Sequence, residues 1–284
     1  MRGDFVTDLS PASASAQTTW RSRWQGQQTA FLWLLSLPLI AFLLIPLAAL
    51  LLRLSPTALL SHLFQPQVAQ AIALSMATTG ATLLITLLVG TPVGFLLGRN
   101  EFRGRNLMDT LIDLPMVLPP AVAGIALLLA FGRRGLFGQY LEDAGIHIAF
   151  TQTAVVMAQL FVAAPFYVKA AAAGFAAIDA ELEQAASLDG AGGWQIFWWI
   201  TLPLARTALL GGAVMTWARA LGEFGATIIF AGNFPGRTQT MPLAIYLGFE
   251  LDLNIALTLA VILLAASFLV LLVVKGLLGQ RVRL

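Results

Sequence analysis

The chain has 284 residues, of which 58% are hydrophobic and only 11% are charged, and its mean hydropathy is +0.83. Because a soluble domain carries about 25% charged residues, this composition excludes a soluble globular protein and indicates an integral membrane protein. A net charge of only +2 without a long basic cluster argues against a nucleic-acid partner. There is no cysteine, and His62 and His147 lie far apart in polar connectors, so we expect no disulfide, thiol nucleophile or metal site.

Residues 1–28 are rich in Ser, Thr, Gln and Ala and lack apolar periodicity, which predicts a flexible, solvated N-terminal tail. The membrane domain then comprises residues 29–284. Its first apolar run, Ala30–Leu52, is longer than the roughly 7–15-residue core of a signal peptide. It also reaches the roughly 20 residues that a membrane-spanning helix needs. We therefore expect a retained helix.

Six apolar runs are long enough to cross a bilayer, and they are continuous rather than short and alternating as barrel strands would be. The predicted fold is therefore all-α with six transmembrane helices. An even number of spans places both termini on one side of the membrane. The runs are Ala30–Leu52, Ala69–Gly98, Leu107–Phe131, Thr153–Phe175, Leu204–Phe230 and Ile255–Leu278.

The lysines and arginines favour one side of this topology, which the positive-inside rule identifies as cytoplasmic. That side holds both termini and the loop between the fourth and fifth spans. Its basic residues are Arg2, Arg21, Arg23, Arg99, Arg103, Arg105, Lys169, Arg206, Lys275, Arg281 and Arg283. The opposite side holds only Arg53, Arg133, Arg134 and Arg237.

The third span is irregular, because Asp109 and Asp113 precede the segment Leu114–Pro120, which contains three prolines. Proline donates no backbone hydrogen bond and disfavours helix in the residue before it. Residues 107–114 are therefore expected at the membrane interface, with the membrane helix beginning near Pro119 or Pro120. A functional gate and a proline-started helix with snorkelled carboxylates both remain open.

A polar segment, Glu183–Pro203, separates the fourth and fifth spans. Asp179 is a plausible N-cap for a short helix, and Gly190 suits a left-handed helix end. The spacing of its residues resembles the "EAA" loop through which permeases of bacterial ABC importers dock on their ATPase, with Gln184 at the usual glutamate. The resemblance implies a cytoplasmic coupling helix; an ordinary interfacial loop is the alternative. The implied coupling residues are Glu183, Gln184, Ala185, Ala186, Gly190, Ile200, Leu202 and Pro203.

The fifth span contains Arg219 and Glu223, four residues apart and so able to share one face of a helix. Charges inside a span are expensive and are functional hypotheses by default. With Thr227, these residues are our candidates for the translocation path, where Arg219 would help an anion past and Glu223 would prevent tight binding. A neutralised pair that only packs helices together is the alternative.

This run and the following Asn233–Leu243 resemble the membrane subunit of molybdate importers, within the wider molybdate, tungstate and sulfate group. The resemblance covers roughly residues 68–275. It implies a type I (MetI-like) permease in the bacterial inner membrane that passes a tetrahedral oxyanion, most readily molybdate, with sulfate or tungstate as alternatives. It also implies a homodimer, two ABC ATPases using ATP and Mg, and an oxyanion-binding protein. Arg133, Arg134 and Arg237 would meet the oxyanion or that protein, or be simple interfacial arginines.

The chain itself is not expected to be an enzyme or to hold a cofactor. A phosphate-binding loop needs Gly-x-x-x-x-Gly-Lys-Ser/Thr, and neither Lys169 nor Lys275 lies in that context. The ATPase must then be a separate protein. An ATP-independent secondary transporter is the rival from another class, but such proteins often carry paired, inverted halves, and no such repeat stands out.

Overall fold

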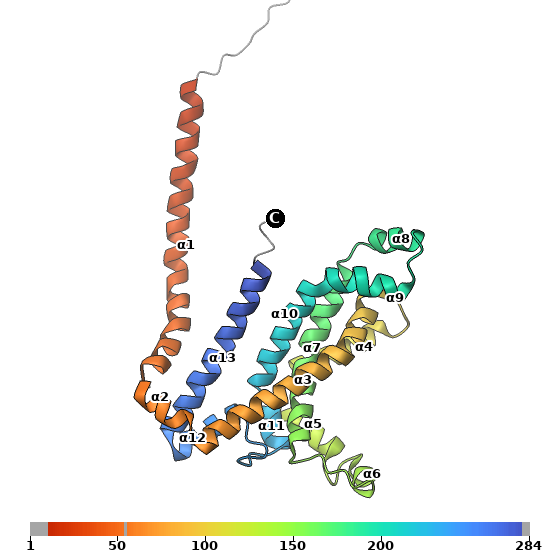
Figure 1. Cartoon of the computed structure of the whole chain (residues 1–284). Coiled ribbons are helices and arrows are strands. Elements are labelled where there is room, and N and C mark those ends of the chain that lie inside the picture. The colour runs from red at the N-terminus through yellow and green to blue at the C-terminus, as the bar shows by residue number, and fades with distance from the viewer. Residues whose placement is uncertain (1–10, 54–55, 280–284) are drawn as a thin grey trace, which may run out of the picture. The chain divides into compact units, whose positions relative to one another are not determined.

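The computed structural model describes residues 11–53 and 56–279 (Figure 1), and within them every regular element is helical. In chain order these are α1 Pro11–Arg53, α2 Pro56–Leu63, α3 Pro66–Arg99, α4 Arg105–Val117, α5 Pro120–Phe131, α6 Gly138–Asp143, α7 Gln152–Ala176, α8 Ala180–Leu188, α9 Gly193–Ile196, the π-helix η1 Phe197–Thr201, α10 Leu202–Leu221, α11 Gly225–Phe230, α12 Met241–Leu251 and α13 Leu253–Gly279. The predicted all-α fold is confirmed.

Helix α1 forms a unit of its own, separate from the remainder of the chain. Its segment Phe31–Arg53 is long and apolar enough to span a membrane, close to the predicted first span. The helix begins at Pro11, so residues 11–28 of the predicted tail are helical. The Ala, Gln and Arg residues there are ordinary helix formers, and a helix already nucleated in the apolar run extends at little further cost.

Some residues used in the sequence argument are not described. The remaining part of the predicted tail, residues 1–10, lies outside the described residues. Arg2, Arg281 and Arg283 from the charge count also lie outside, and so do the side chains of Arg21, Arg23 and Lys275.

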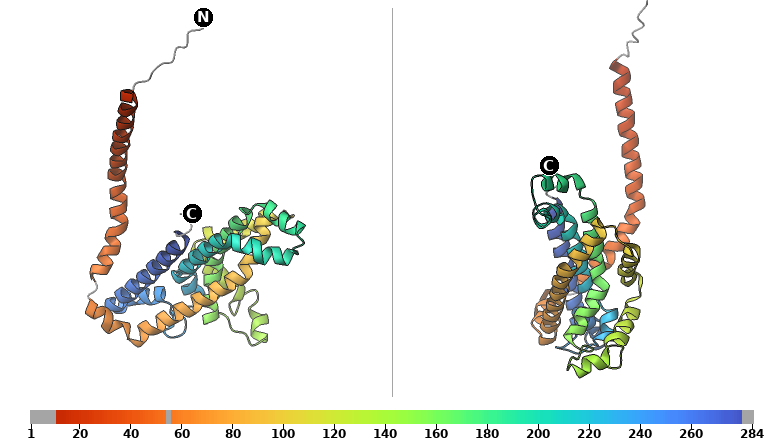
Figure 2. Two further views of the ribbon diagram at one scale, coloured as in Figure 1. Left: turned by 45° about the horizontal axis from the view of Figure 1, so that its top comes forward. Right: turned by 90° about the vertical axis from the view of Figure 1, so that its right-hand side faces the viewer.

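The core of the second unit, residues 54–284, is built on α3, α7 and α10, which lie side by side (Figures 1 and 2). Small residues allow this close approach. A Cβ atom added to Gly94 of α3 would lie 2.6 Å from the Cβ of Ala171 on α7, and one added to Gly98 would lie 2.5 Å from the carbonyl oxygen of Ala172. The glycines at these positions therefore set the distance between α3 and α7.

Replacing Gly94 with alanine is expected to destabilise the protein by about 1–3 kcal/mol, because the added methyl group overpacks the contact between α3 and α7. Gly80→Ala on the same helix is the matched control, since a Cβ there meets nothing within 4 Å. Thermal unfolding of the detergent-purified protein measures the difference. Equal midpoints for the two variants would contradict the packing argument.

The third predicted span is not one straight helix. Helices α4 and α5 meet at an angle of 115°, because Leu118 and Pro119 have extended ψ values of 135° and 133°. The membrane helix begins at Pro120, as the prolines predicted. By length and composition five described helices can cross a membrane, and this bent pair would make a sixth.

The fifth predicted span, 204–230, is not one continuous helix in its last third, because α10 ends at Leu221 and α11 begins at Gly225. The hydropathy of the run concealed a break that depends on polar contacts. Glu223 accepts a hydrogen bond from the backbone N–H of Ala226 at 2.8 Å and so caps α11. A Cβ on Gly225 would lie 2.7 Å from the Cβ of Pro120, so the break also lets α11 lie against α5.

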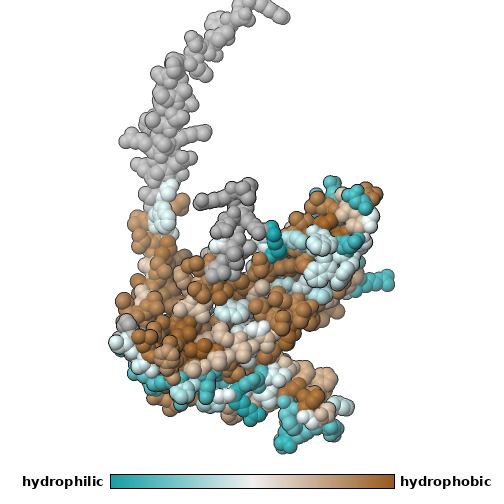
Figure 3. Space-filling view, in the orientation of Figure 1, coloured by the Kyte–Doolittle hydropathy of each residue, from teal (hydrophilic) through white to brown (hydrophobic). Residues whose placement is uncertain are grey.

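The surface of the second unit has an apolar belt between two more polar ends (Figure 3). One end carries α8 and α9, and the other carries α6 and the loop between α11 and α12 (Figure 1). This arrangement is typical of a membrane protein whose polar ends lie in water on opposite sides. The coupling segment and the predicted outer arginines therefore lie at opposite ends.

Candidate functional site

Helix α8, Ala180–Leu188, is the predicted coupling helix, and its two ends are fixed by local residues. The Asp179 side chain accepts a hydrogen bond from the N–H of Glu181 at 3.0 Å, which confirms the predicted N-cap. Gly190 has φ +90°, which confirms the predicted left-handed end. The N–H groups of Gly190 and Ala191 bond to the carbonyls of Ser187 and Ala186, the pattern of a Schellman motif.

The outer face of α8 is open. Leu188 is 90% exposed and Leu182 is 50% exposed, while Gln184 and Ala185 are also exposed. The two leucines therefore leave apolar surface exposed at this polar end of the molecule.

Beside the helix, a shallow groove of about 380 Å³ includes Gly190 and Ile200. The fold therefore brings these two predicted coupling residues together. Ala186 is half-buried, and Leu202 with Pro203 begins α10 directly after η1.

Glu183 points inward and joins three parts of the chain. Its carboxylate forms an ion pair with Arg99 at the end of α3 and accepts a hydrogen bond from the hydroxyl of Thr201 at 2.7 Å. Arg99 also donates to the carbonyl of Ile178 at 2.8 Å. Glu183 is one of the predicted coupling residues, and its contacts hold α8 against the core. Because 84 residues separate Arg99 from Glu183, no local pattern could reveal the pair.

The aromatic residues after α8 form a cluster. The ring of Phe197 lies 5.4 Å from that of Phe95 on α3 and 5.7 Å from that of Trp198, both edge to face. Trp194 stacks on Phe197 at 6.2 Å. Trp199, in contrast, is 80% exposed. The cluster packs the segment Trp194–Trp198 against α3.

Arg219 and Glu223 lie together but in different environments. The Nη1 atom of Arg219 is 2.7 Å from Oε2 of Glu223, and the two side chains are 30% and 1% exposed, respectively. Glu223 is thus a buried counter-ion that also caps α11. Arg219 keeps part of its guanidinium accessible.

The accessible part of Arg219 lines a cavity of about 330 Å³. Its other walls are the bend Pro115–Pro120 and the α7 residues Val162 and Phe166. The fold therefore joins two separate motifs from the sequence, the proline-rich bend and the charged run. Thr227 is fully buried and is not among the residues that line this cavity.

The three arginines expected on the outer side lie at the end opposite α8. Arg133 pairs with Glu142 of α6 at 2.8 Å, yet its side chain remains 81% exposed. Arg134 and Arg237 are exposed. The loop of Arg237 is ordered by the hydroxyl of Thr238, which accepts the N–H of Phe234 at 3.1 Å.

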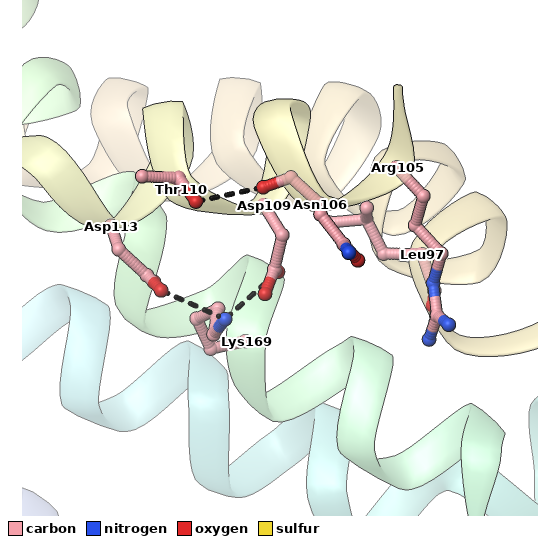
Figure 4. Close-up of polar contacts among 7 residues, drawn as sticks. All are labelled: Leu97, Arg105, Asn106, Asp109, Thr110, Asp113 and Lys169. Atoms are coloured by element: carbon pink, nitrogen blue, oxygen red, sulfur yellow. Dashed lines mark hydrogen bonds and ion pairs between the residues drawn. The ribbon is translucent and has the colours of Figure 1, made fainter. Parts of the chain in front are cut away.

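Sequence reasoning missed a second charged cluster, between α4 and α7 (Figure 4). The ammonium of Lys169 lies 2.8 Å from Asp109 and 3.1 Å from Asp113. From the sequence, Lys169 indicates only the orientation of the protein, and the two carboxylates are expected at the membrane interface. Within the described residues, no group of three or more His, Asp or Glu side chains could hold a metal ion.

Residues 90–284 match the family described as binding-protein-dependent transport system inner membrane component. The chain belongs to this family. Its relatives in that family include the molybdenum transport permease ModB of Mycobacterium tuberculosis, 41% identical over 82% of this chain and 88% of that protein. ModB of Escherichia coli K12 is 43% identical over 62% of this chain and 78% of its own length. The sulfate permease CysW of Synechococcus elongatus is 37% identical over 75% and 74%.

Solved structures of bacterial ABC transporters share the fold. A bacterial alginate ABC transporter chain superposes with a TM-score of 0.67 over 89% of this chain and 96% of its own, at 17% identity. The methionine transporter MetNI in an inward-facing conformation gives 0.56 over 75% and 94%, also at 17% identity. The chain is therefore a multi-pass membrane permease of the MetI-like fold.

Proposed function

We propose that this chain is the membrane-spanning subunit of an ATP-driven importer that passes molybdate into the cytoplasm. The observation that carries the proposal is the 41% identity to a molybdenum permease over 82% of this chain. In this function the chain hydrolyses nothing itself, and ATP and Mg are used by a partner ATPase. Sulfate and tungstate are the alternative cargoes, since the sulfate permease relative is 37% identical.

Three kinds of partner would complete the transporter complex. Two ATPase subunits would dock on α8 and its exposed Leu188. In this arrangement α8 would lie on the cytoplasmic side, and with six spans both termini would lie there too. A second copy of this chain would close the path around a two-fold axis, the usual arrangement for a homodimer. An oxyanion-binding protein would meet the opposite end, where Arg133, Arg134 and Arg237 attract either the oxyanion or acidic residues of that protein.

Arg219 is the residue that we assign to the anion path. Its guanidinium lines the cavity at the proline-rich bend while Glu223 neutralises it from the buried side. A path needs sites that attract an ion strongly enough for entry and weakly enough for exit. Arg219, whose positive charge is partly offset by Glu223, meets both needs. Glu223 supports Arg219 and caps α11 rather than contacting the anion.

Reconstitution tests the function directly. The permease, its ATPase and its oxyanion-binding protein in liposomes should take up radioactive molybdate only with ATP. Replacing the phosphate-loop lysine of the ATPase should abolish uptake, because that lysine holds the nucleotide phosphates. Competition by unlabelled tungstate and sulfate ranks the cargoes. Uptake that survives without the ATPase would instead support the secondary-transporter alternative. If sulfate outcompetes molybdate, sulfate is the cargo.

A further inference from the structure

Within the second unit, helix α4 is only loosely packed. None of its 13 residues is buried. At its start, Arg105 donates to the carbonyl of Leu97 on α3 at 2.8 Å and 3.1 Å. Further along, its link to α7 is the cluster of Lys169 with Asp109 and Asp113 (Figure 4). Polar contacts rather than a buried apolar face therefore place this helix.

The cluster has two carboxylates for one ammonium. Asp109 and Asp113 are four residues apart and so share one face of α4, one helical turn from each other. Sliding α4 along α7 by one turn, about 5.4 Å, would still leave Lys169 beside one carboxylate. The three side chains are 35–43% exposed, so each ion pair contributes little to stability. Two registers of α4 against α7 would therefore each keep an ion pair. We call this cluster of Lys169, Asp109 and Asp113 the latch.

One face of α7 connects the latch to both functional regions. Val162 and Phe166 line the Arg219 cavity, and Lys169 follows within one turn. Beyond it, α7 ends at Ala176 and leads into the coupling helix at Ala180. On α4, Asp113 of the latch lies two residues before Pro115, and Pro115 also lines the cavity. A movement of α4 relative to α7 thus changes the wall of the cavity.

We propose that Lys169 is a positioning residue that transmits motion of the coupling helix, through α4 and the bend Pro115–Pro120, to the cavity at Arg219. The latch rests on the proposed function, because it assumes an ATPase that moves α8. Coupling free energies between distant sites typically correspond to roughly 5- to 150-fold effects. Uptake per ATP hydrolysed in a Lys169→Met transporter should fall by a factor in that range.

A cysteine reporter separates this role from a merely structural one. The chain has no cysteine, so Leu118→Cys places a single thiol on the cavity wall. In the complex with its ATPase, the thiol should react with a soluble maleimide at different rates without nucleotide and when trapped with ATP and vanadate. Lys169→Met should abolish that difference while ATP hydrolysis continues. An unchanged, nucleotide-dependent rate in Lys169→Met would overturn the proposal.

Two further variants complete the test. Glu101→Gln removes an ion pair with Arg105 in which the glutamate is 92% exposed, and it should leave the labelling difference unchanged. If Lys169→Met fails to assemble, Asp109→Asn with Asp113→Asn removes the same latch and leaves a half-exposed lysine that water can solvate. That double variant must also lose the labelling difference, or the latch is wrong. Labelling requires no cargo, so a wild-type complex that switches but imports no molybdate contradicts only the proposed cargo.

Discussion

Replacing Gly190 with valine is expected to uncouple ATP hydrolysis from uptake while the membrane helices remain folded. Gly190 has φ +90°, and a residue with a Cβ pays about 1–2 kcal/mol there, with β-branched residues the worst fit. Nothing lies within 4 Å of the added Cβ, so the effect acts through the backbone of the α8 terminus. We expect hydrolysis by the assembled complex to continue and uptake to fall roughly tenfold or more, a loss of about 1.4 kcal/mol of coupling.

Gly190→Asn is the matched control, because asparagine tolerates the left-handed conformation. It should retain most of the uptake. Ala186→Arg tests the same interface differently, by placing a long charged side chain beside the exposed face of α8. If both Gly190→Val and Ala186→Arg associate with the ATPase and take up molybdate normally, α8 is not the coupling helix.

Removing the Arg219 side chain is expected to have the largest effect on stability. In Arg219→Met the carboxylate of Glu223, only 1% exposed, keeps the N–H of Ala226 but loses its cation. Breaking a buried ion pair in this way costs roughly 3–5 kcal/mol. Glu223→Gln should cost less, because its amide oxygen can still accept the N–H of Ala226 and Arg219 is 30% exposed to water.

The double variant Arg219→Met with Glu223→Gln separates folding from transport. It removes both charges, so the thermal midpoint in detergent should recover most of the loss seen in Arg219→Met. Uptake in liposomes should not recover, since the cation that attracts the anion is gone. If the double variant transports molybdate normally, Arg219 and Glu223 are only a structural pair, the alternative that the sequence left open.

The local features of the coupling segment could be predicted well. Asp179 and Gly190 act within one or two residues of themselves, and cap chemistry depends on that short range. The start of α5 at Pro120 follows for the same reason, because a proline constrains its own φ and the residue before it. The apolar runs also located α3, α7 and α13 within a few residues, since hydropathy reports the transfer of a whole segment to lipid.

The candidate sites could be predicted only in part. Arg219 and Glu223 stand out because charges in apolar runs are rare, but their spacing suggested one continuous helix. The helix in fact stops at Leu221, and the carboxylate serves α11 as well as the arginine. Lys169 meets Asp109 across 60 residues, and no periodicity in the sequence joins them.

By itself, the sequence determined that this is a helical membrane protein, where its apolar segments lie and how the ends of α8 form. These depend on composition and on contacts within a turn. Only the tertiary structure decided the bend between α4 and α5, the inward direction of Glu183, the cavity at Arg219 and the ion pairs of Lys169 with Asp109 and Asp113. In a low-dielectric interior each charged group must find a partner, and which partner it finds depends on helices brought together from distant parts of the chain.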